Sequence, residues 1–570
     1  MTAVPVASAS NRGVRRNPKT ASGFTLLDLA LLAVSAAGMA LAFPAPSLWF
    51  LVIPSLALLL GVLDRVGPLR ATVYAFAWGM GFMMPLISWM QIATDGTWLA
   101  WVALAGAQAF FIGLFGLSFS AMGVWKWARS IWGEALGGAV LWVAFEEIRS
   151  RVPYGGFAWG KLSYPQVDSP LVAFAPIGGE VLVAFVVVVI AVLLRRAFAV
   201  AAPLGQTSVP ARFSSLFIAI ALFVVPIAVK LPSTQQAGAV TVAVIQGNVE
   251  VPAFQTFSEV GKVTSNHARV TDKMISADAQ PDVIFWGEHS VDRDPRVYPE
   301  VAAIVAESVD AAGVPIVVGF MEEADTERKN WVGVWEPKSG LSDVLYGKQH
   351  PVPWGEYVPM REISQRLATA AAQVSVDMVP VNNPALLDVP LADGRELPIV
   401  VGICFEVAYE PIISEGVQLG GQLIVIPTNN AQFLDSAESV QQLQMARFRA
   451  AEFSRSTLQV STNGVSAIIR PDGSVYAQSA AQTADFLVAS VPLRTTLTPS
   501  AKMGELPARL AMGLGLGLAA CSLGAYLYGR SLWRFQQRAQ SQNSQRPSAQ
   551  RPSAQRPSAQ KQSMQKQSMQ

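Results

Sequence analysis

Cysteine and histidine are scarce in this chain of 570 residues, which contains only two cysteines and three histidines. Two cysteines exclude a framework of several disulfides, and three histidines leave little material for a histidine-based metal site. We therefore expect no metal ion and no cofactor.

Charged residues are also few. They make up 14% of the chain, whereas soluble domains are about a quarter charged. Apolar residues make up 51% of the chain, so a single ordinary soluble globule is excluded. The formal net charge of +2 argues against a nucleic-acid-binding protein, which normally carries a basic stripe.

Long apolar runs take the place of the missing charge. A membrane helix needs about 17–25 apolar residues, and eight runs are candidates: 24–43, 48–63, 71–92, 98–122, 132–147, 171–194, 213–231 and 508–528. The second and fifth are short, and the fifth ends at Glu146 and Glu147. We expect a seven-span membrane domain at 24–237 and an eighth membrane helix at 507–529.

The positions of the basic residues predict an orientation, because cytoplasmic loops are enriched in lysine and arginine. Basic residues precede the first span and occur in alternate loops, although Arg149, Arg151 and Lys161 break this alternation. Residues 238–506 hold 18 basic and 32 acidic residues. We expect both termini, including residues 1–23, in the cytoplasm and 238–506 outside the cell membrane. Losing one short span would instead place that domain in the cytoplasm.

Residues 238–506 have the pattern of a layered α/β domain, in which short β-branched runs alternate with helical stretches. The expected strands are 241–246, 282–286, 314–320, 331–335, 398–404, 422–428, 458–462, 466–470 and 485–491. The expected helices include 257–277, 298–312 and 436–453. The segment from His350 to Asp393 shows few clear elements, and we expect either a lid or an ordinary surface loop there.

The end of the chain has a different composition. After Gly529 the sequence contains three copies of RPSAQ and two of KQSMQ. Such polar, basic repeats lack apolar residues to bury. We expect residues 530–570 to form a disordered cytoplasmic tail.

Three residues with catalytic chemistry each follow an apolar strand of the α/β domain: Glu288, Lys348 and Cys404. A thiol is a nucleophile once a base takes its proton, and an ammonium can stabilise an oxyanion. We expect burial beside Trp286 to raise the pKa of Glu288 towards that of a working base. Taken singly, a solvated charge (Glu288, Lys348) or a buried thiol (Cys404) is the more frequent role for such a residue.

The surrounding motifs resemble those of the carbon–nitrogen hydrolase (nitrilase) superfamily, whose αββα sandwich carries a Glu–Lys–Cys triad. Residues 246–248 resemble its QGN motif, 348–359 its KxHLVPFGEYVP, 402–406 its GxxICYE, 428–430 its TND, 444–452 its QMARxRAxE and 461–464 its STNNG. With seven spans before the domain and one after it, the chain resembles the apolipoprotein N-acyltransferase family, and residues 151–159 resemble that family's R…TGFPW loop.

The resemblance implies transfer of an acyl chain from a membrane phospholipid to the α-amino group of a diacylglyceryl-cysteine apolipoprotein. Glu288 would be the general base, Cys404 the nucleophile of a thioester acyl-enzyme in a ping-pong reaction, and Lys348 the stabiliser of the oxyanion. The alternative is a membrane-anchored amidase that uses water as acceptor.

Further residues follow from the same motifs. Glu356 and Glu406 would support the triad, and Trp354, Tyr357 and Phe405 would bind substrate. Three positions depart from the family pattern: Gly287 replaces a proline, Phe405 a tyrosine and Asn430 an aspartate.

Overall fold

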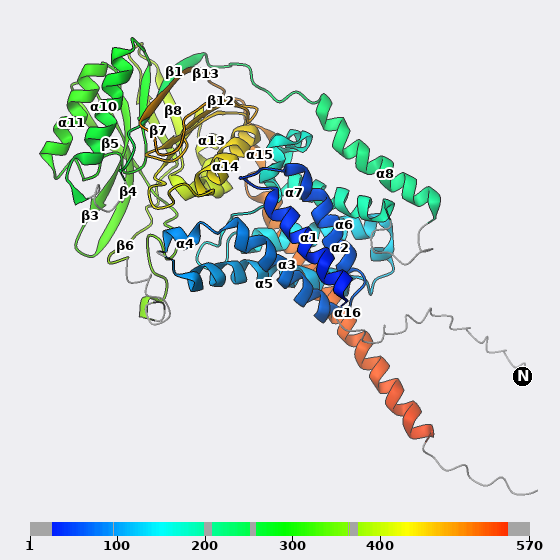
Figure 1. The fold of residues 1–570 in the computed structure, drawn as a ribbon. Helices are drawn as coiled ribbons and strands as arrows, with labels where there is room; N and C mark the ends of the chain where they lie inside the picture. Colours follow the sequence, from blue (N-terminus) through cyan, green and yellow to red (C-terminus); the bar gives the residue numbers. More distant parts are fainter. Residues whose placement is uncertain are drawn as a thin grey trace, which may run out of the picture.

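The computed structural model describes residues 25–94, 96–198, 208–250, 258–362, 364 and 374–544. The helices of the N-terminal part of the chain gather on one side of the molecule, and the sheets lie on the other together with the helices that pack on them. One long helix, α16, projects beyond both (Figure 1). The N-terminal residues 1–24 and the RPSAQ and KQSMQ repeats lie outside the described residues.

Each of the eight apolar runs is helical. The helices are α1 (Leu26–Leu41), η1 (Trp49–Leu51) with α2 (Val52–Leu63), α3 (Pro68–Leu86), α4 (Met90–Ala93), α5 (Trp98–Met122), α6 (Ile131–Arg149), α7 (Ala175–Ala197), α8 (Val209–Val224) and α16 (Leu506–Ser544). Four helical segments of the described chain are long and apolar enough to cross a membrane: Trp98–Met122, Pro170–Ala197, Val209–Ala228 and Leu506–Ala539. The number of crossings and their direction remain predictions.

The second part of the chain forms two stacked sheets. The first has the order β13-β1-β2-β3-β4-β5 with β6 beside β4, and the second β12-β11-β10-β9-β8-β7. The first contains β1 (Ala239–Gln246), β2 (Val283–Trp286), β3 (Ile316–Glu323), β4 (Glu327–Glu336), β5 (Gly340–Gly347), β6 (Asp377–Met378) and β13 (Asp485–Pro492). The second contains β7 (Leu386–Pro390), β8 (Glu396–Val401), β9 (Leu423–Thr428), β10 (Ser456–Ser461), β11 (Ala467–Ile469) and β12 (Val475–Gln478).

Helices cover the outer face of each sheet. Apolar residues of α10 (Lys262–Ser276) and α11 (Pro299–Ala312) pack on β1, β2 and β3, while α13 (Glu410–Gln418) and α14 (Glu438–Phe453) pack against the second sheet. The neighbours β1–β2–β3 and β8–β9–β10 are parallel, which places the carboxyl ends of these strands together. The predicted nitrilase-like αββα sandwich is confirmed.

Several sequence expectations differ from the structure, and the expected strands do not include β5, β6, β7 and β12. Helix α16 continues to Ser544, so residues 530–544, expected to be disordered, are helical. Residues 386–390, expected within a long loop, form β7 and pair with β8, because alternate side chains of this short strand are buried against the sheet.

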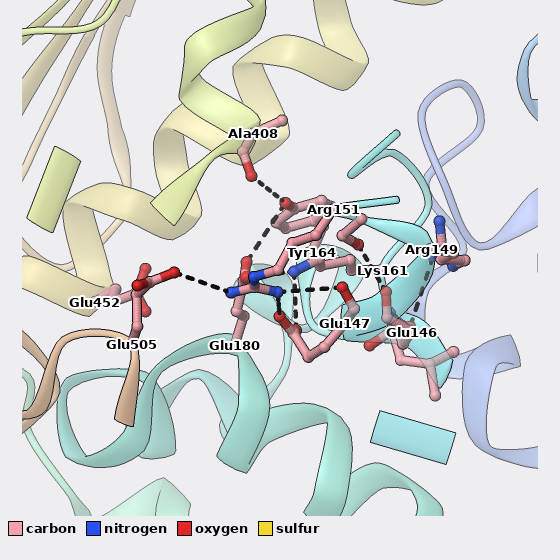
Figure 2. A network of polar contacts seen from close by, with 12 residues as sticks. Glu146, Glu147, Arg149, Arg151, Lys161, Tyr164, Glu180, Ala408, Glu452 and Glu505 are labelled. Carbon is pink, nitrogen blue, oxygen red and sulfur yellow. Dashed lines mark hydrogen bonds and ion pairs between the residues drawn. The ribbon is translucent and has the colours of Figure 1, made fainter. Parts of the chain in front are cut away.

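A buried ionic network joins the two halves of the molecule (Figure 2). Arg449 of α14 donates to Glu180 of α7 at 2.9 Å and to Glu452 at 2.5 Å. Glu180 also pairs with Lys161, which lies 2.9 Å from Glu147 of α6. Buried charges are tolerated only when they are paired, so α6, α7 and α14 are fixed relative to one another.

The same network explains the basic residues that break the loop alternation. Arg149 and Lys161 are almost fully buried. Arg149 donates to the backbone carbonyls of Phe157, Trp159 and Gly160, and Arg151 pairs with Glu147. These cations therefore have partners within the protein.

Removing Arg449 tests the network. Arg449→Leu leaves Glu180 and Glu452 buried without their main partner, and loss of one member of a buried pair costs about 3–5 kcal/mol. We expect a marked fall in the unfolding temperature, measured by tryptophan fluorescence in detergent. The control, Arg447→Gln, removes a more exposed ion pair to Asp168 from the same helix and should cost at most about 1 kcal/mol. Equal shifts in the two variants would contradict the role of the network.

Candidate active site

Glu288, Lys348 and Cys404 meet between the two sheets. Glu288 follows β2 and Lys348 follows β5 of the first sheet, whereas Cys404 follows β8 of the second and begins the 3₁₀ turn η7 (Cys404–Ala408). All three are therefore placed by strand ends, as the sequence predicts. The nitrogen of Lys348 lies 3.4 Å from Glu288 Oε1.

Lys348 lies between two carboxylates. Its Nζ is 2.5 Å from Glu356 Oε1, and its side chain is 1% exposed. Burial alone would lower the pKa of this ammonium, but Glu356 and Glu288 outweigh burial and hold the pKa well above its ordinary value. Lys348 is therefore a constant cation in the site. The other oxygen of Glu356 accepts a hydrogen bond from the backbone nitrogen of Val352 at 2.7 Å, which fixes its carboxylate.

Glu288 is held by neutral donors as well as by Lys348. Asn330 Nδ2 donates to Oε1 at 2.7 Å, and the backbone nitrogen of Asn429 donates to Oε2 at 2.8 Å. Burial would raise the pKa of Glu288, but Lys348 and these donors outweigh it, and the pKa lies below its ordinary value. The expected rise is therefore wrong. The indole of Trp286 instead points towards α10, where its nitrogen donates to Thr271.

Cys404 occupies a constrained position. Its φ is +55°, a left-handed conformation that side chains other than glycine seldom adopt. Thr428 Oγ1 lies 3.4 Å and Gln442 Nε2 3.6 Å from the sulfur. Burial and the nearby Glu288 raise the pKa of the thiol, while Lys348 opposes them. The resting sulfur therefore carries its proton at neutral pH.

Glu406 ties the nucleophile turn to the segment that follows Lys348. One oxygen accepts from the backbone nitrogens of Gln349 and His350, and the other from Ile403 nitrogen and from the Tyr346 hydroxyl, at 2.7–2.9 Å. Burial outweighs these bonds and raises the pKa of Glu406 to about 7. The position of this side chain, away from the sulfur, suits a support for the turn.

The three expected substrate-binding residues lie against the loop that follows α6. Phe405 stacks on Trp159 with ring centroids 5.3 Å apart. Trp354, 46% exposed, packs edge-on against Tyr154, and the Tyr357 hydroxyl lies 3.5 Å from the Tyr154 carbonyl. The structure thus brings this membrane-domain loop to the edge of the site.

Contacts in the structure account for two departures from the family pattern, Gly287 and Asn430. A Cβ at position 287 would lie 2.8 Å from the backbone nitrogen of Thr462, so only glycine fits there. Asn430 Nδ2 donates to Glu438 at 2.7 Å and to Gln442 Oε1 at 3.1 Å. An aspartate could make neither bond, and burial already raises the pKa of Glu438 to about 8.

Four polar neighbours of the triad were not among the predicted site residues: Asn330, Thr428, Asn429 and Gln442. They come from β4, β9, the segment after β9 and α14. Thr428 and Asn429 belong to the motif after β9, which was a usable signal. No sequence signal marked Asn330 or Gln442, because their relevance lies in a contact across the fold. Among the described residues, no group of three or more His, Cys, Asp or Glu side chains could hold a metal ion.

Comparisons with known proteins agree in both halves of the chain. Residues 35–193 match the family model of the apolipoprotein N-acyltransferase N-terminal domain, and residues 241–497 match that of the carbon-nitrogen hydrolases. The apolipoprotein N-acyltransferase of Mycolicibacterium smegmatis is 32% identical over 525 residues, which cover 86% of this chain and 85% of that protein. That of Azotobacter vinelandii is 30% identical over 462 residues, 78% and 86% of the two chains.

Solved structures are more distant. Nit3 of Saccharomyces cerevisiae, a member of branch 10 of the nitrilase superfamily, is 11% identical, with a TM-score of 0.35 over 46% of this chain and 93% of that one. An amidase from Nesterenkonia sp. is 13% identical, with a TM-score of 0.32 over 47% of this chain and 94% of that one.

The raised pKa of Cys404 can be measured by alkylation. In a Cys521→Ser background, the rate of Cys404 modification by iodoacetamide should still be rising above pH 9, because only the thiolate reacts. Lys348→Met should move this rise to higher pH, since Lys348 favours the thiolate. Lys329→Met, which removes a more exposed lysine of β4, is the control and should leave the profile unchanged. A rate that is constant from pH 7 upwards would contradict the protonated resting thiol.

Proposed function

The chain belongs to the apolipoprotein N-acyltransferase family, and from this we propose that it acylates the N-terminal α-amino group of diacylglyceryl-cysteine apolipoproteins with a chain taken from a membrane phospholipid. It is a multi-pass membrane protein and an acyltransferase of the nitrilase superfamily. The observation that most supports the site assignment is the meeting of Glu288, Lys348 and Cys404 between the sheets.

The first half-reaction forms the acyl-enzyme. Glu288 takes the proton of the Cys404 thiol as the sulfur attacks the ester carbonyl of the phospholipid. The ammonium of Lys348 stabilises the negative charge on the tetrahedral oxygen. The carbon–oxygen bond to glycerol then breaks, Glu288 returns its proton to the leaving oxygen, and a lysophospholipid departs. A thioester remains on Cys404.

The second half-reaction consumes the thioester. The α-amine of the acceptor has an ordinary pKa of about 8, so a useful fraction is uncharged at neutral pH. This amine attacks the thioester carbonyl, Glu288 takes the proton that the nitrogen loses, and Lys348 again stabilises the oxyanion. The carbon–sulfur bond breaks and the sulfur regains a proton from Glu288. The product carries an amide at its N-terminus.

The aromatic residues of the loop after α6 are evidence for a lipid as the substrate. Tyr154 and Trp159, which precede the seventh helix, contact Trp354 and Phe405 of the α/β domain at the edge of the site. Aromatic residues are favoured at membrane interfaces. In the proposed orientation the α/β domain lies outside the cell membrane and both termini lie in the cytoplasm. The acceptor and the donor then reach the site by lateral diffusion in the membrane.

The alternative is an amidase that uses the same triad with water as the acceptor. It would have no need for the membrane-domain loop at the edge of the site or for the buried ion pairs that attach α14 to α7. Under either reaction a thioester forms, so the two differ in the fate of the acyl group.

The acyl-enzyme provides the test. Protein in vesicles of phosphatidylglycerol and phosphatidylethanolamine with labelled acyl chains should keep label after SDS and lose it with hydroxylamine, whereas Cys404→Ala should take up none. Cys521→Ala is the matched control and should label normally. Glu288→Gln should slow labelling about 100-fold or more, because general-base catalysis contributes about 10²–10⁴.

Addition of a diacylglyceryl-cysteinyl peptide then separates the two reactions. Transfer of the label to the peptide N-terminus, seen by mass spectrometry, is expected. Release as free fatty acid with an unmodified peptide would support the amidase-like alternative. Absence of any adduct on Cys404 would overturn the proposed acyl transfer.

A further inference from the structure

We propose that Gln442 donates an amide N–H to the sulfur of Cys404 during acyl transfer, and that the adjacent Gln441 positions it by anchoring α14 on the membrane domain. This inference rests on the proposed role of Cys404 as the nucleophile. Gln442 contacts the reacting atom, whereas Gln441 acts through the helix.

The orientation of the Gln442 amide follows from its partners. Its Oε1 accepts from Asn430 Nδ2 at 3.1 Å and from Thr428 Oγ1 at 2.9 Å. Asn430 is itself fixed, because its Oδ1 accepts from Ser461 Oγ at 2.7 Å. An amide whose oxygen is held in this way presents its N–H₂ group in the other direction. That group lies 3.6 Å from Cys404 Sγ, within reach of a sulfur acceptor.

The second neighbour of the sulfur is Thr428, whose hydroxyl can donate either to the sulfur or to the amide oxygen of Gln442. Thr428 Oγ1 lies 3.4 Å from Sγ and 2.9 Å from Gln442 Oε1. A hydroxyl has a single hydrogen, so Thr428 serves one acceptor at a time. When it donates to the amide oxygen, Gln442 is the side chain that donates a hydrogen bond to the sulfur.

The side chain of Gln441 makes four hydrogen bonds, and all four go to the membrane domain. Its Oε1 accepts from the indole nitrogens of Trp159 at 2.6 Å and Trp89 at 3.1 Å. Its Nε2 donates to the carbonyls of Pro44 at 3.1 Å and Leu86 at 3.0 Å. The amide is buried and every one of its donor and acceptor positions is used. Such a fully satisfied buried amide resists displacement, since any shift leaves polar groups unpaired.

The two glutamines therefore link the membrane domain to the nucleophile through one peptide unit. A second contact also links the membrane domain to the nucleophile. Trp159 donates to Gln441 and stacks on Phe405, which follows Cys404 in the chain. A displacement of the helices around Trp89 and Trp159 would move the N–H of Gln442 relative to the sulfur.

Loss of the hydrogen bond from Gln442 should affect the thiolate form of Cys404 more than the protonated thiol. Glu288, Lys348 and Glu438 are the charged or titratable groups that act on the sulfur. The N–H of Gln442 favours the thiolate, as Lys348 does, and gains most when the sulfur attacks and when it leaves the thioester. Loss of a hydrogen bond to a charged group should cost about tenfold in rate.

The test measures the pH profile of Cys404 alkylation in full-length protein with Cys521→Ser, together with the rate of acyl-enzyme formation. Gln442→Leu and the near-isosteric Gln442→Glu both remove the N–H. Each should shift the alkylation profile to higher pH by about one unit and slow acylation about tenfold at unchanged half-saturating lipid. Gln442→Asn keeps an amide and should recover part of the loss.

Gln441→Leu should produce the same direction of shift although it does not touch the sulfur. Arg447→Gln, an interdomain contact on the same helix, should leave the profile unchanged. Unchanged profiles in the folded Gln442 variants would overturn the donor, and a Gln441 variant that lowers only the unfolding temperature would overturn the positioning. Alkylation needs no lipid, so these outcomes stay distinct from failure of the proposed acyl transfer.

Discussion

The buried guanidinium of Arg449 fixes the nucleophile relative to the membrane helices. It pairs with Glu180 of α7 and donates to the carbonyls of Val407 and Ala408 in the turn that begins at Cys404. A charge without water is stable only while its partners stay in place. These contacts hold the helix, the turn and the membrane domain together, which suits the proposed reaction of two substrates anchored in the bilayer.

The charges of the site favour the negative charge of the proposed tetrahedral oxyanion over that of a resting thiolate. Lys348 is a constant cation between Glu288 and Glu356, and Glu288 is a carboxylate of lowered pKa, while burial keeps the proton on Cys404. Transfer of that proton to Glu288 is unfavourable by itself. In the proposed reaction it becomes favourable as negative charge moves from sulfur to the substrate oxygen, where an ammonium held in advance costs no reorganisation.

The departures from the family pattern are local adjustments with visible partners. Gly287 leaves room for the end of β10, and Asn430 supplies the two N–H donors that Glu438 and Gln442 require. Phe405 lacks a hydroxyl but presents a flat ring to Trp159. In each case a neighbouring group accounts for the residue that is present.

The sequence by itself determined most of the helices and strands, because these follow from local runs of apolar residues. It placed Glu288, Lys348 and Cys404 at strand ends, and the motifs around them indicated the family. Tertiary structure decided what those residues meet. The lowered pKa of Glu288 comes from Lys348, 60 positions away, and Gln442 reaches the sulfur across the fold. Such contacts depend on how sheets and helices pack, and no local pattern of side chains encodes a distance between segments far apart in the chain.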